Sequence, residues 1–294
     1  MSHSHVHNHS HSHDGSLVKA LIVTLALVLI KIAGAYWGHS LALGADAAHS
    51  LGDVGSLGLA VYADRQSRRP PSPRFSFGWG RIEILAGLVN ALLLWILAGG
   101  MIWEAINQWS MPIRANSAIM AIFATLALLI NGILAWDFRE AKDYNHKSTL
   151  LHLLADAAGS LGVLIGAIAL QFTGWSPINP LVTILIAILM LWGSWNIIRD
   201  TVFILLEATP HTLPLVEITR SMETVLGVDH VHDLHVWIVG SKQPALACHI
   251  ALDINAPPPQ EILCNLHELL ICYGIDHSTI QFETPDEIHD EPSW

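Results

Sequence analysis

Charged residues are scarce in this chain, and cysteine is scarcer still. Aspartate, glutamate, lysine and arginine make up 13% of its 294 residues, whereas hydrophobic residues make up 52%. This composition excludes a purely soluble domain and favours a membrane protein. The few cysteines show no C-x-x-C spacing, so we expect reduced cytoplasmic thiols rather than a disulfide framework or a thiolate zinc site. They are Cys248, Cys264 and Cys272.

Sequence motifs of common enzymes are also missing. His267-Glu268 resembles the start of a zinc protease motif, but the second histidine does not follow, because residues 269–271 are Leu-Leu-Ile. The chain also lacks a nucleophile elbow and a phosphate-binding glycine loop. An intramembrane metalloenzyme is therefore only an alternative, and we expect no enzymatic activity.

Long apolar segments fill the first two thirds of the chain. A bilayer core of roughly 30 Å requires about 20 apolar residues of helix. Six windows reach that length, and they predict an all-α bundle of six transmembrane helices contacting a lipid bilayer. The windows are residues 17–37, 41–63, 82–106, 118–137, 150–172 and 181–206.

Charge separates a membrane part, residues 17–208, from a tail, residues 209–294. Up to residue 208 the chain has 12 basic and 12 acidic residues, whereas the tail has only Arg220 and Lys242 against 13 acidic residues. Basic residues crowd the second and fourth connections, so these loops and both termini are predicted to be cytoplasmic. The tail is then an acidic cytoplasmic domain, and we expect no nucleic-acid partner.

The N-terminal residues 1–16 form a low-complexity segment that is rich in histidine. Such a segment buries too little surface to fold, so we expect it to be disordered. Its composition suits loose capture of Zn²⁺, although a passive or engineered tail has the same composition. Its histidines are His3, His5, His7, His9, His11 and His13.

Two copies of the pattern His-x-x-x-Asp lie in the second and fifth windows. They are His49 with Asp53, and His152 with Asp156. Residues four apart share one face of a helix, so each pair presents an imidazole and a carboxylate to the same point. Ionisable groups at membrane depth cost about 3 kcal/mol each, and a divalent cation would offset that cost. Four ligands of N₂O₂ type suit Zn²⁺ and accept Cd²⁺, Co²⁺ or Ni²⁺ less selectively.

Other polar residues in the windows are less informative. Asp46 precedes His49 by three residues and shares its face, so it either orients that imidazole or is a fifth ligand; the orienting role is favoured. Snorkelling at helix ends or interhelical hydrogen bonds explain the remaining ones without a transport role. These residues are Lys31, Asn90, Glu104 and Asn131.

Together these features resemble the cation diffusion facilitator family over nearly the whole chain. The resemblance rests on six spans, the two His-x-x-x-Asp pairs, the stretch Leu-Ala-Leu-Gly-Ala-Asp-Ala-Ala-His at 41–49, the loop Phe-Gly-Trp-Gly-Arg-Ile-Glu at 77–83, a histidine-rich end and an acidic tail. The two His/Asp pairs are similar to the zinc-preferring branch. The resemblance implies a homodimeric exporter that exchanges cytoplasmic Zn²⁺ for protons, and short loops with a compact tail favour a bacterial inner membrane.

Proton exchange also follows from the residue types themselves. A neutral imidazole binds metal and a protonated one does not, so His49 and His152 would hold either the ion or protons. Two carboxylates offset the charge of Zn²⁺, which lowers the penalty of crossing a low-dielectric region. A metal sensor with its ligands in the soluble tail is the other alternative function.

The tail reads as a small α/β domain with the order α-β-β-α-β. Apolar spacing predicts helices over 214–226 and 259–273 and strands over 230–239, 246–254 and 279–283, forming an open sheet with helices on one face. It resembles the ferredoxin-like cytoplasmic domain of the same family, which dimerises and binds extra metal. On that resemblance His232, His249 and His277 are candidates for a regulatory zinc site. Glu283 is a weaker candidate, since an extended strand places it too far from His277 to share one ion.

Overall fold

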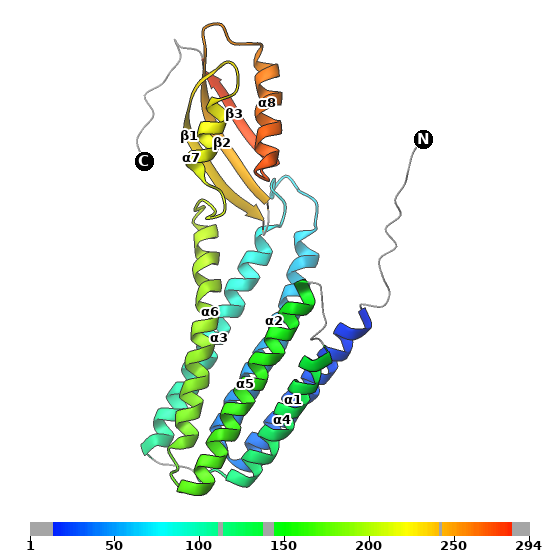
Figure 1. The fold of residues 1–294 in the computed structure, drawn as a ribbon, viewed down its shortest axis with the longest axis vertical. Coiled ribbons are helices and arrows are strands. Elements are labelled where there is room, and N and C mark those ends of the chain that lie inside the picture. The colour runs from blue at the N-terminus through cyan, green and yellow to red at the C-terminus, as the bar shows by residue number, and fades with distance from the viewer. Residues whose placement is uncertain (1–13, 111–113, 138–143, 241–242, 284–294) are drawn as a thin grey trace. The chain divides into compact units, whose positions relative to one another are not determined.

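A computed structural model describes residues 14–110, 114–137, 144–240 and 243–283, although the side chain of His152 is not among those described. Each predicted apolar window falls on one long helix (Figure 1). The helices are α1 (Asp14–Gly38), α2 (Leu41–Ser67), α3 (Arg81–Ser110), α4 (Ser117–Asp137), α5 (Tyr144–Thr173) and α6 (Ile178–Leu205).

Four of these helices, α3 to α6, are long and apolar enough to cross a membrane. In α1 the apolar part with described side chains, Ile22–Gly38, is shorter than 18 residues. In α2 the apolar character is interrupted by Asp46, His49 and Asp53, residues that the sequence proposes for a metal site. Length and composition therefore confirm four spans and do not by themselves confirm six.

The chain divides into two compact units. The first consists of Met1–Gly58 and Asn90–Trp195, and the second of Leu59–Val89 and Asn196–Trp294. In the first unit, helices α2 to α6 meet around a core in which alanine predominates. Small side chains allow helix backbones to approach closely, which is how helices associate in a membrane. The buried alanines of this core are Ala42, Ala45, Ala98, Ala124, Ala167 and Ala187.

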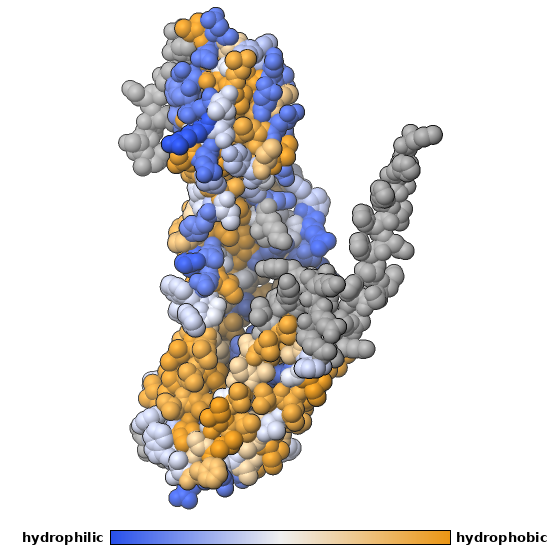
Figure 2. Space-filling model, in the orientation of Figure 1, coloured by the Kyte–Doolittle hydropathy of each residue, from blue (hydrophilic) through white to orange (hydrophobic). Residues whose placement is uncertain are grey.

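The outer surface of the first unit is apolar. Figure 2 shows hydrophobic residues over the visible face of these helices. A surface of this extent is unsuited to water and matches the hydrocarbon of a bilayer. Large side chains that are more than 60% exposed include Ile96, Trp103, Ile122, Ile133, Phe172 and Trp192.

The start of α2 is fixed by polar contacts to α6. Ser40 Oγ accepts a hydrogen bond from the backbone N–H of Leu43 at 3.2 Å, which satisfies a free donor in the first turn. Asn179 Oδ1 accepts from Ser40 Oγ at 2.9 Å and from the backbone N–H of Ala42 at 3.1 Å. These bonds anchor the helix that carries the first His-x-x-x-Asp pair.

The C-terminal part of the second unit is a small α/β domain. Its elements follow the order α-β-β-α-β: α7 (Leu215–Glu223), β1 (Val228–Gly240), β2 (Gln243–Leu252), α8 (Pro259–Cys272) and β3 (His277–Glu283). The strands form one sheet in the order β1-β2-β3, with β1 antiparallel and β3 parallel to β2.

Both helices of this domain cover the same face of the sheet, as predicted. Ile218 of α7 and Leu266 of α8 share one buried cluster with Leu246, Cys248 and Ile250, which alternate along β2. Side chains alternate between the faces of a strand, so the residues between these three point to the other face. That helix-free face carries Ala245, Ala247, His249 and Ala251.

A β-bulge in β1 places its histidines relative to the helix-free face. His232 pairs with His249 and His235 pairs with Ala247, so three steps along β1 match two along β2. Asp233 in this bulge has a φ of 48°, in the left-handed region. The extra residue keeps His232 and His235 on the same face as His249, which is the usual effect of a bulge on side-chain direction.

Cysteine reactivity provides a test of this domain. Burial raises the pKa of Cys248 to about 12, and the nearby Asp233 adds to the effect, so its thiol stays protonated at neutral pH. Cys264 and Cys272 are exposed. We expect maleimide at pH 7 to label these two in the folded protein and Cys248 only after denaturation, as read by mass spectrometry of peptides. Equally fast labelling of Cys248 in the native protein would contradict this packing.

Candidate metal centres

The first candidate centre lies in the first unit, between α2 and α5. One ligand atom each from His49, Asp53 and Asp156 can be chosen so that all three lie within 4.8 Å of one another. The two residues on α2 approach directly, with Nε2 of His49 3.7 Å from Oδ2 of Asp53. The predicted i, i+4 face is therefore present on α2, and it meets a carboxylate of the fifth predicted span.

Burial and local chemistry suit a cation at this point. The carboxylate of Asp156 is buried, while His49 and Asp53 are partly exposed. Nδ1 of His49 is buried and makes no hydrogen bond to the described residues. Two carboxylates and one imidazole within such distances form three quarters of a tetrahedral N₂O₂ set. His152, one turn before Asp156 on α5, has its side chain outside the described residues.

Next to this centre, Asp46 forms a buried ion pair. Lys31 Nζ donates to Asp46 Oδ1 at 2.9 Å and to Ser50 Oγ at 2.8 Å. Ser160 Oγ donates to the other oxygen, Oδ2, at 3.1 Å. The network therefore joins α1, α2 and α5. Both oxygens of Asp46 accept from donors other than His49, which differs from the orienting role that the sequence favours.

Lys31 was not predicted as part of any site, yet it is completely buried. Snorkelling, one of two ordinary explanations for a lysine in a membrane helix, would leave its ammonium group exposed. A signal for the pair exists in the sequence, since Lys31 and Asp46 are opposite charges in adjacent apolar windows. Such charges are expected to pair with each other inside a membrane protein.

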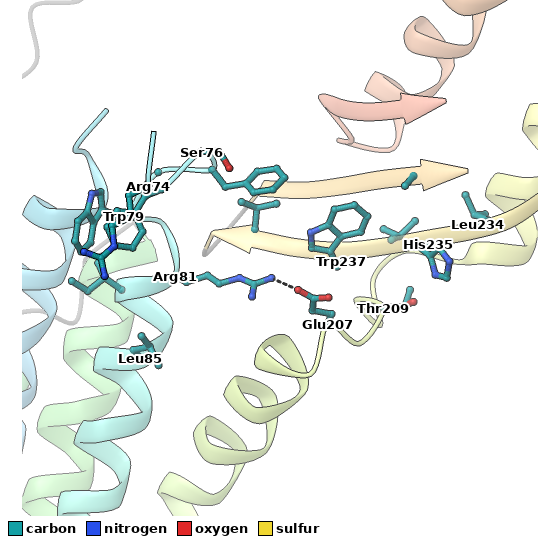
Figure 3. A pocket seen from close by; sticks show the side chains of 17 residues that line it. Arg74, Ser76, Trp79, Arg81, Leu85, Glu207, Thr209, Leu234, His235 and Trp237 are labelled. Carbon is teal, nitrogen blue, oxygen red and sulfur yellow. Dashed lines mark hydrogen bonds and ion pairs between the residues drawn. The ribbon is translucent and has the colours of Figure 1, made fainter. Parts of the chain in front are cut away.

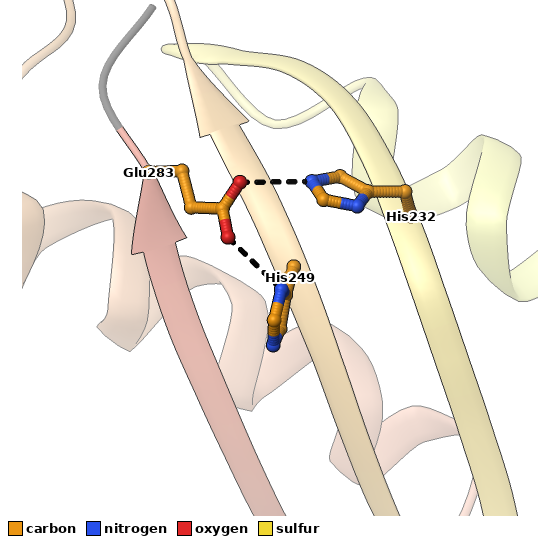
Figure 4. A group of neighbouring side chains, drawn as sticks. All are labelled: His232, His249 and Glu283. Carbon is orange, nitrogen blue, oxygen red and sulfur yellow. Dashed lines mark ion pairs between the residues drawn. The ribbon is translucent and has the colours of Figure 1, made fainter. Parts of the chain in front are cut away.

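The second candidate centre lies on the helix-free face of the C-terminal sheet (Figure 4). Ligand atoms of His232, His249 and Glu283 all lie within 4.8 Å of one another. The carboxylate lies between the two rings, with Oε2 3.2 Å from Nε2 of His232 and Oε1 2.9 Å from Nδ1 of His249. Glu283 itself is only 3% exposed, so a buried charge faces two imidazoles.

Strand register explains why this group differs from the predicted trio. In the parallel pairing of β2 with β3, Ala251 lies opposite Glu283 and Ala245 lies opposite His277. Glu283 is therefore a diagonal neighbour of His249, within reach of a long side chain. His277 lies at the opposite end of β3 and is not part of the group in this chain. The third member of the group with His232 and His249 is therefore Glu283, the weaker candidate from the sequence, and not His277.

A cavity of about 870 Å³ in the second unit contains neither candidate centre. Its lining includes Arg74, Trp79 and Arg81 from the connection into α3 and Trp237 from β1 (Figure 3). Arg81 Nη2 donates to Glu207 Oε1 at 2.8 Å, so two of its charged groups already compensate each other. The described residues that line this cavity include no group of potential metal ligands close enough to share one ion.

Comparison with known proteins matches both parts of the chain to one family. A model of the cation efflux transmembrane domain matches residues 17–206. A second model, of the cation efflux protein cytoplasmic domain, matches residues 210–285. Together with the four apolar helices, these matches identify a multi-pass membrane protein with a C-terminal cytoplasmic-type domain.

Characterised relatives match along almost their entire length. The zinc transporter ZitB of Escherichia coli is 36% identical over 290 residues, covering 96% of this chain and 92% of that protein. The cadmium, cobalt and zinc/H(+)-K(+) antiporter of Bacillus subtilis is 33% identical, covering 99% and 94%. The metal cation efflux system protein CzcD of Cupriavidus metallidurans is 34% identical, covering 96% and 90%.

Solved structures match as well, and one of them is a domain of a named transporter. It is the metal-bound C-terminal domain of the CzcD transporter, 35% identical, covering 24% of this chain and 99% of that one with a TM-score of 0.23. The transmembrane model alone covers well over half of the chain, and the relatives exceed 30% identity across it. The chain therefore belongs to the cation diffusion facilitator family of cation efflux transporters.

Proposed function

We propose that this protein exports Zn²⁺ from the cytoplasm by exchange for protons. The observation that carries the proposal is the meeting of His49, Asp53 and Asp156 between two helices of the first unit. Relatives that are named as zinc transporters and as a zinc antiporter support the same substrate and the same exchange.

The proposed transport site has four ligands: His49 and Asp53 on α2, and His152 and Asp156 on α5. His152 is included because it repeats the spacing of the α2 pair, one turn before Asp156. Two imidazole nitrogens and two carboxylates favour tetrahedral Zn²⁺, and they also accept Cd²⁺, Co²⁺ or Ni²⁺. Cadmium and cobalt also appear in the name of the Bacillus subtilis relative.

Exchange for protons follows from the chemistry of these ligands. A histidine side chain in water has a pKa of about 6.5, so an imidazole exchanges metal for a proton within the physiological range. Where protons are plentiful, protonation releases the metal. The two carboxylates balance the ion's two charges, so the loaded site crosses the low-dielectric region close to neutrality.

The proposed topology has six spans with both termini in the cytoplasm of a bacterium. The apolar part of α1, Ile22–Gly38, is 17 residues long, which is at the lower limit for a span. α2 is 27 residues long, and its polar residues include the proposed ligands His49 and Asp53 as well as the charged residues Asp64 and Arg65 near its end. The family further supports a homodimer whose C-terminal domains have a ferredoxin-like fold.

A second, regulatory zinc ion is proposed for His232, His249 and Glu283. The buried carboxylate between two imidazoles supports it, because a cation would compensate this charge and use three ligands that are already close. This site lies outside the membrane spans, so its occupancy would report cytoplasmic zinc.

Zinc flux into liposomes tests the transport proposal. With the native protein reconstituted, we expect Zn²⁺ uptake to follow an imposed pH gradient and to stop when an ionophore dissipates it. His152→Ala removes one of the two proposed imidazoles and is expected to abolish the flux, because the site loses both a metal ligand and a group that exchanges metal for a proton. Uptake is measured with an entrapped zinc indicator, and empty liposomes are the control.

The possible results separate the alternatives. Equal zinc movement with and without the gradient would refute proton coupling while leaving a transporter. Absence of zinc movement in the native protein would refute transport and favour a sensor. Full flux in His152→Ala would remove that residue from the ligand set.

A further inference from the structure

The buried pair of Lys31 and Asp46 places a third carboxylate beside the transport site. Asp46 precedes His49 by about one turn on α2, and its partner Ser160 follows Asp156 by about one turn on α5. The carboxylate therefore lies between the same two helices that carry the proposed ligands. It is 1% exposed, and Lys31 is fully buried against it.

The backbone of α5 accommodates this carboxylate closely. A Cβ atom built on Gly159 would lie 3.4 Å from Oδ1 of Asp46, which is van der Waals contact. The backbone of α5 therefore runs close to this carboxylate. Oδ1 accepts from Lys31 and Oδ2 from Ser160, so both oxygens are held in place by donors.

The number and type of ligands around the ion determine which metal the transport site prefers. Four ligands with two imidazoles favour tetrahedral Zn²⁺, whereas additional carboxylate oxygens favour metals such as Mn²⁺ that prefer octahedral oxygen sites. A free Asp46 carboxylate, one turn away, would be attracted by a divalent ion in this low-dielectric setting. Its pairing with a fixed cation removes that attraction.

We propose that Lys31 determines metal specificity by holding the Asp46 carboxylate out of the coordination sphere, so that the transport site stays four-coordinate and selects Zn²⁺ over Mn²⁺. The pair also contributes zero net charge, which leaves the charge of Asp53 and Asp156 to match the divalent ion. This inference rests on the proposed function, since it assigns selectivity to the same transport site.

The test compares Mn²⁺ and Zn²⁺ uptake in liposomes for three proteins: native, Lys31→Met and Lys31→Met/Asp46→Asn. Lys31→Met releases the carboxylate, and we expect the Mn²⁺/Zn²⁺ rate ratio to rise about tenfold. The double variant also lacks the lysine but has no carboxylate to release, so its ratio is expected to return to the native value. A merely structural role for the pair would lower both rates without changing their ratio.

Coordination geometry is the second measurement, and it does not depend on transport. All variants for this measurement also carry His232→Ala and His249→Ala, which remove the second centre. Co²⁺ is added to each detergent-solubilised variant, and its visible absorption spectrum is recorded. The spectrum of the corresponding Asp156→Asn variant, in which the transport site is disabled, is subtracted. Strong bands of tetrahedral Co²⁺ are expected with Lys31 present and weaker bands with Lys31→Gln or Lys31→Met.

The possible results test the role of Lys31 and the proposed transport function separately. An unchanged metal ratio together with unchanged Co²⁺ bands in Lys31→Met would overturn the role of Lys31. A raised ratio that persists in the double variant would also overturn it, because Asp46 would then not be the cause. Failure of the native protein to move zinc would instead refute the proposed function, which this design detects separately.

Discussion

Replacement of Asp156 by asparagine is expected to reduce zinc transport by at least about a hundredfold, since changes even to groups that only support metal ligands cost 10- to 100-fold. Asp156 is the most buried of the three candidate ligands with described side chains and the only one of them on α5. Asparagine preserves its size but removes a charge. A divalent ion would then carry an uncompensated positive charge into a low-dielectric region.

The measurement is the initial rate of zinc uptake into liposomes that contain equal amounts of folded protein. Asp64→Asn is the matched control, because Asp64 is also a carboxylate of α2 but lies near the end of that helix, is exposed and pairs with Arg68 at 2.9 Å. We expect this control to retain nearly native rates. Native rates in Asp156→Asn would show that the three-residue group does not carry the ion.

Periodicity explains how the membrane half of the protein could be predicted. The apolar windows of the sequence coincide with all six long helices, although only α3 to α6 are long and apolar enough to count as spans by themselves. The four-residue spacing of His49 and Asp53 fixes their common face. The sequence also indicates that this pair lies near Asp156 on α5, because ionisable groups inside a membrane protein need a partner of opposite charge or a bound ion.

The contacts that sequence reasoning missed depend on packing between distant segments. Lys31 and Asp46 are 15 residues apart, and only the folded structure shows that the lysine is buried against Asp46 and Ser50 rather than snorkelling. The sequence favours His277 over Glu283 because His277 matches the family's positions, and an extended strand separates the two residues too far for one ion. Which of them joins His249 is decided by the register of β3 against β2. Alternation along β3 puts His277 and Glu283 on the same face, so alternation alone does not choose between them.

Replacement of Glu283 by glutamine is the second change with a large expected effect, here on zinc binding at the C-terminal domain. Its carboxylate contacts both His232 and His249, and it supplies the only negative charge of the group. Glutamine retains the shape but not the charge. We expect zinc affinity of this site to fall by at least about a hundredfold, since even supporting groups of a metal site contribute 10- to 100-fold.

Equilibrium dialysis of the full chain with Zn²⁺ measures this affinity, with Asp156→Asn in all samples so that the transport site does not contribute. His277→Ala is the matched control, because the register places His277 opposite Ala245 rather than beside His249. Equal losses in Glu283→Gln and His277→Ala would show that a partner subunit brings His277 to the ion. Loss only in His277→Ala would refute the site that the single chain forms. Loss only in Glu283→Gln would support a site formed by the three residues that lie together in one chain, with its negative charge supplied by Glu283.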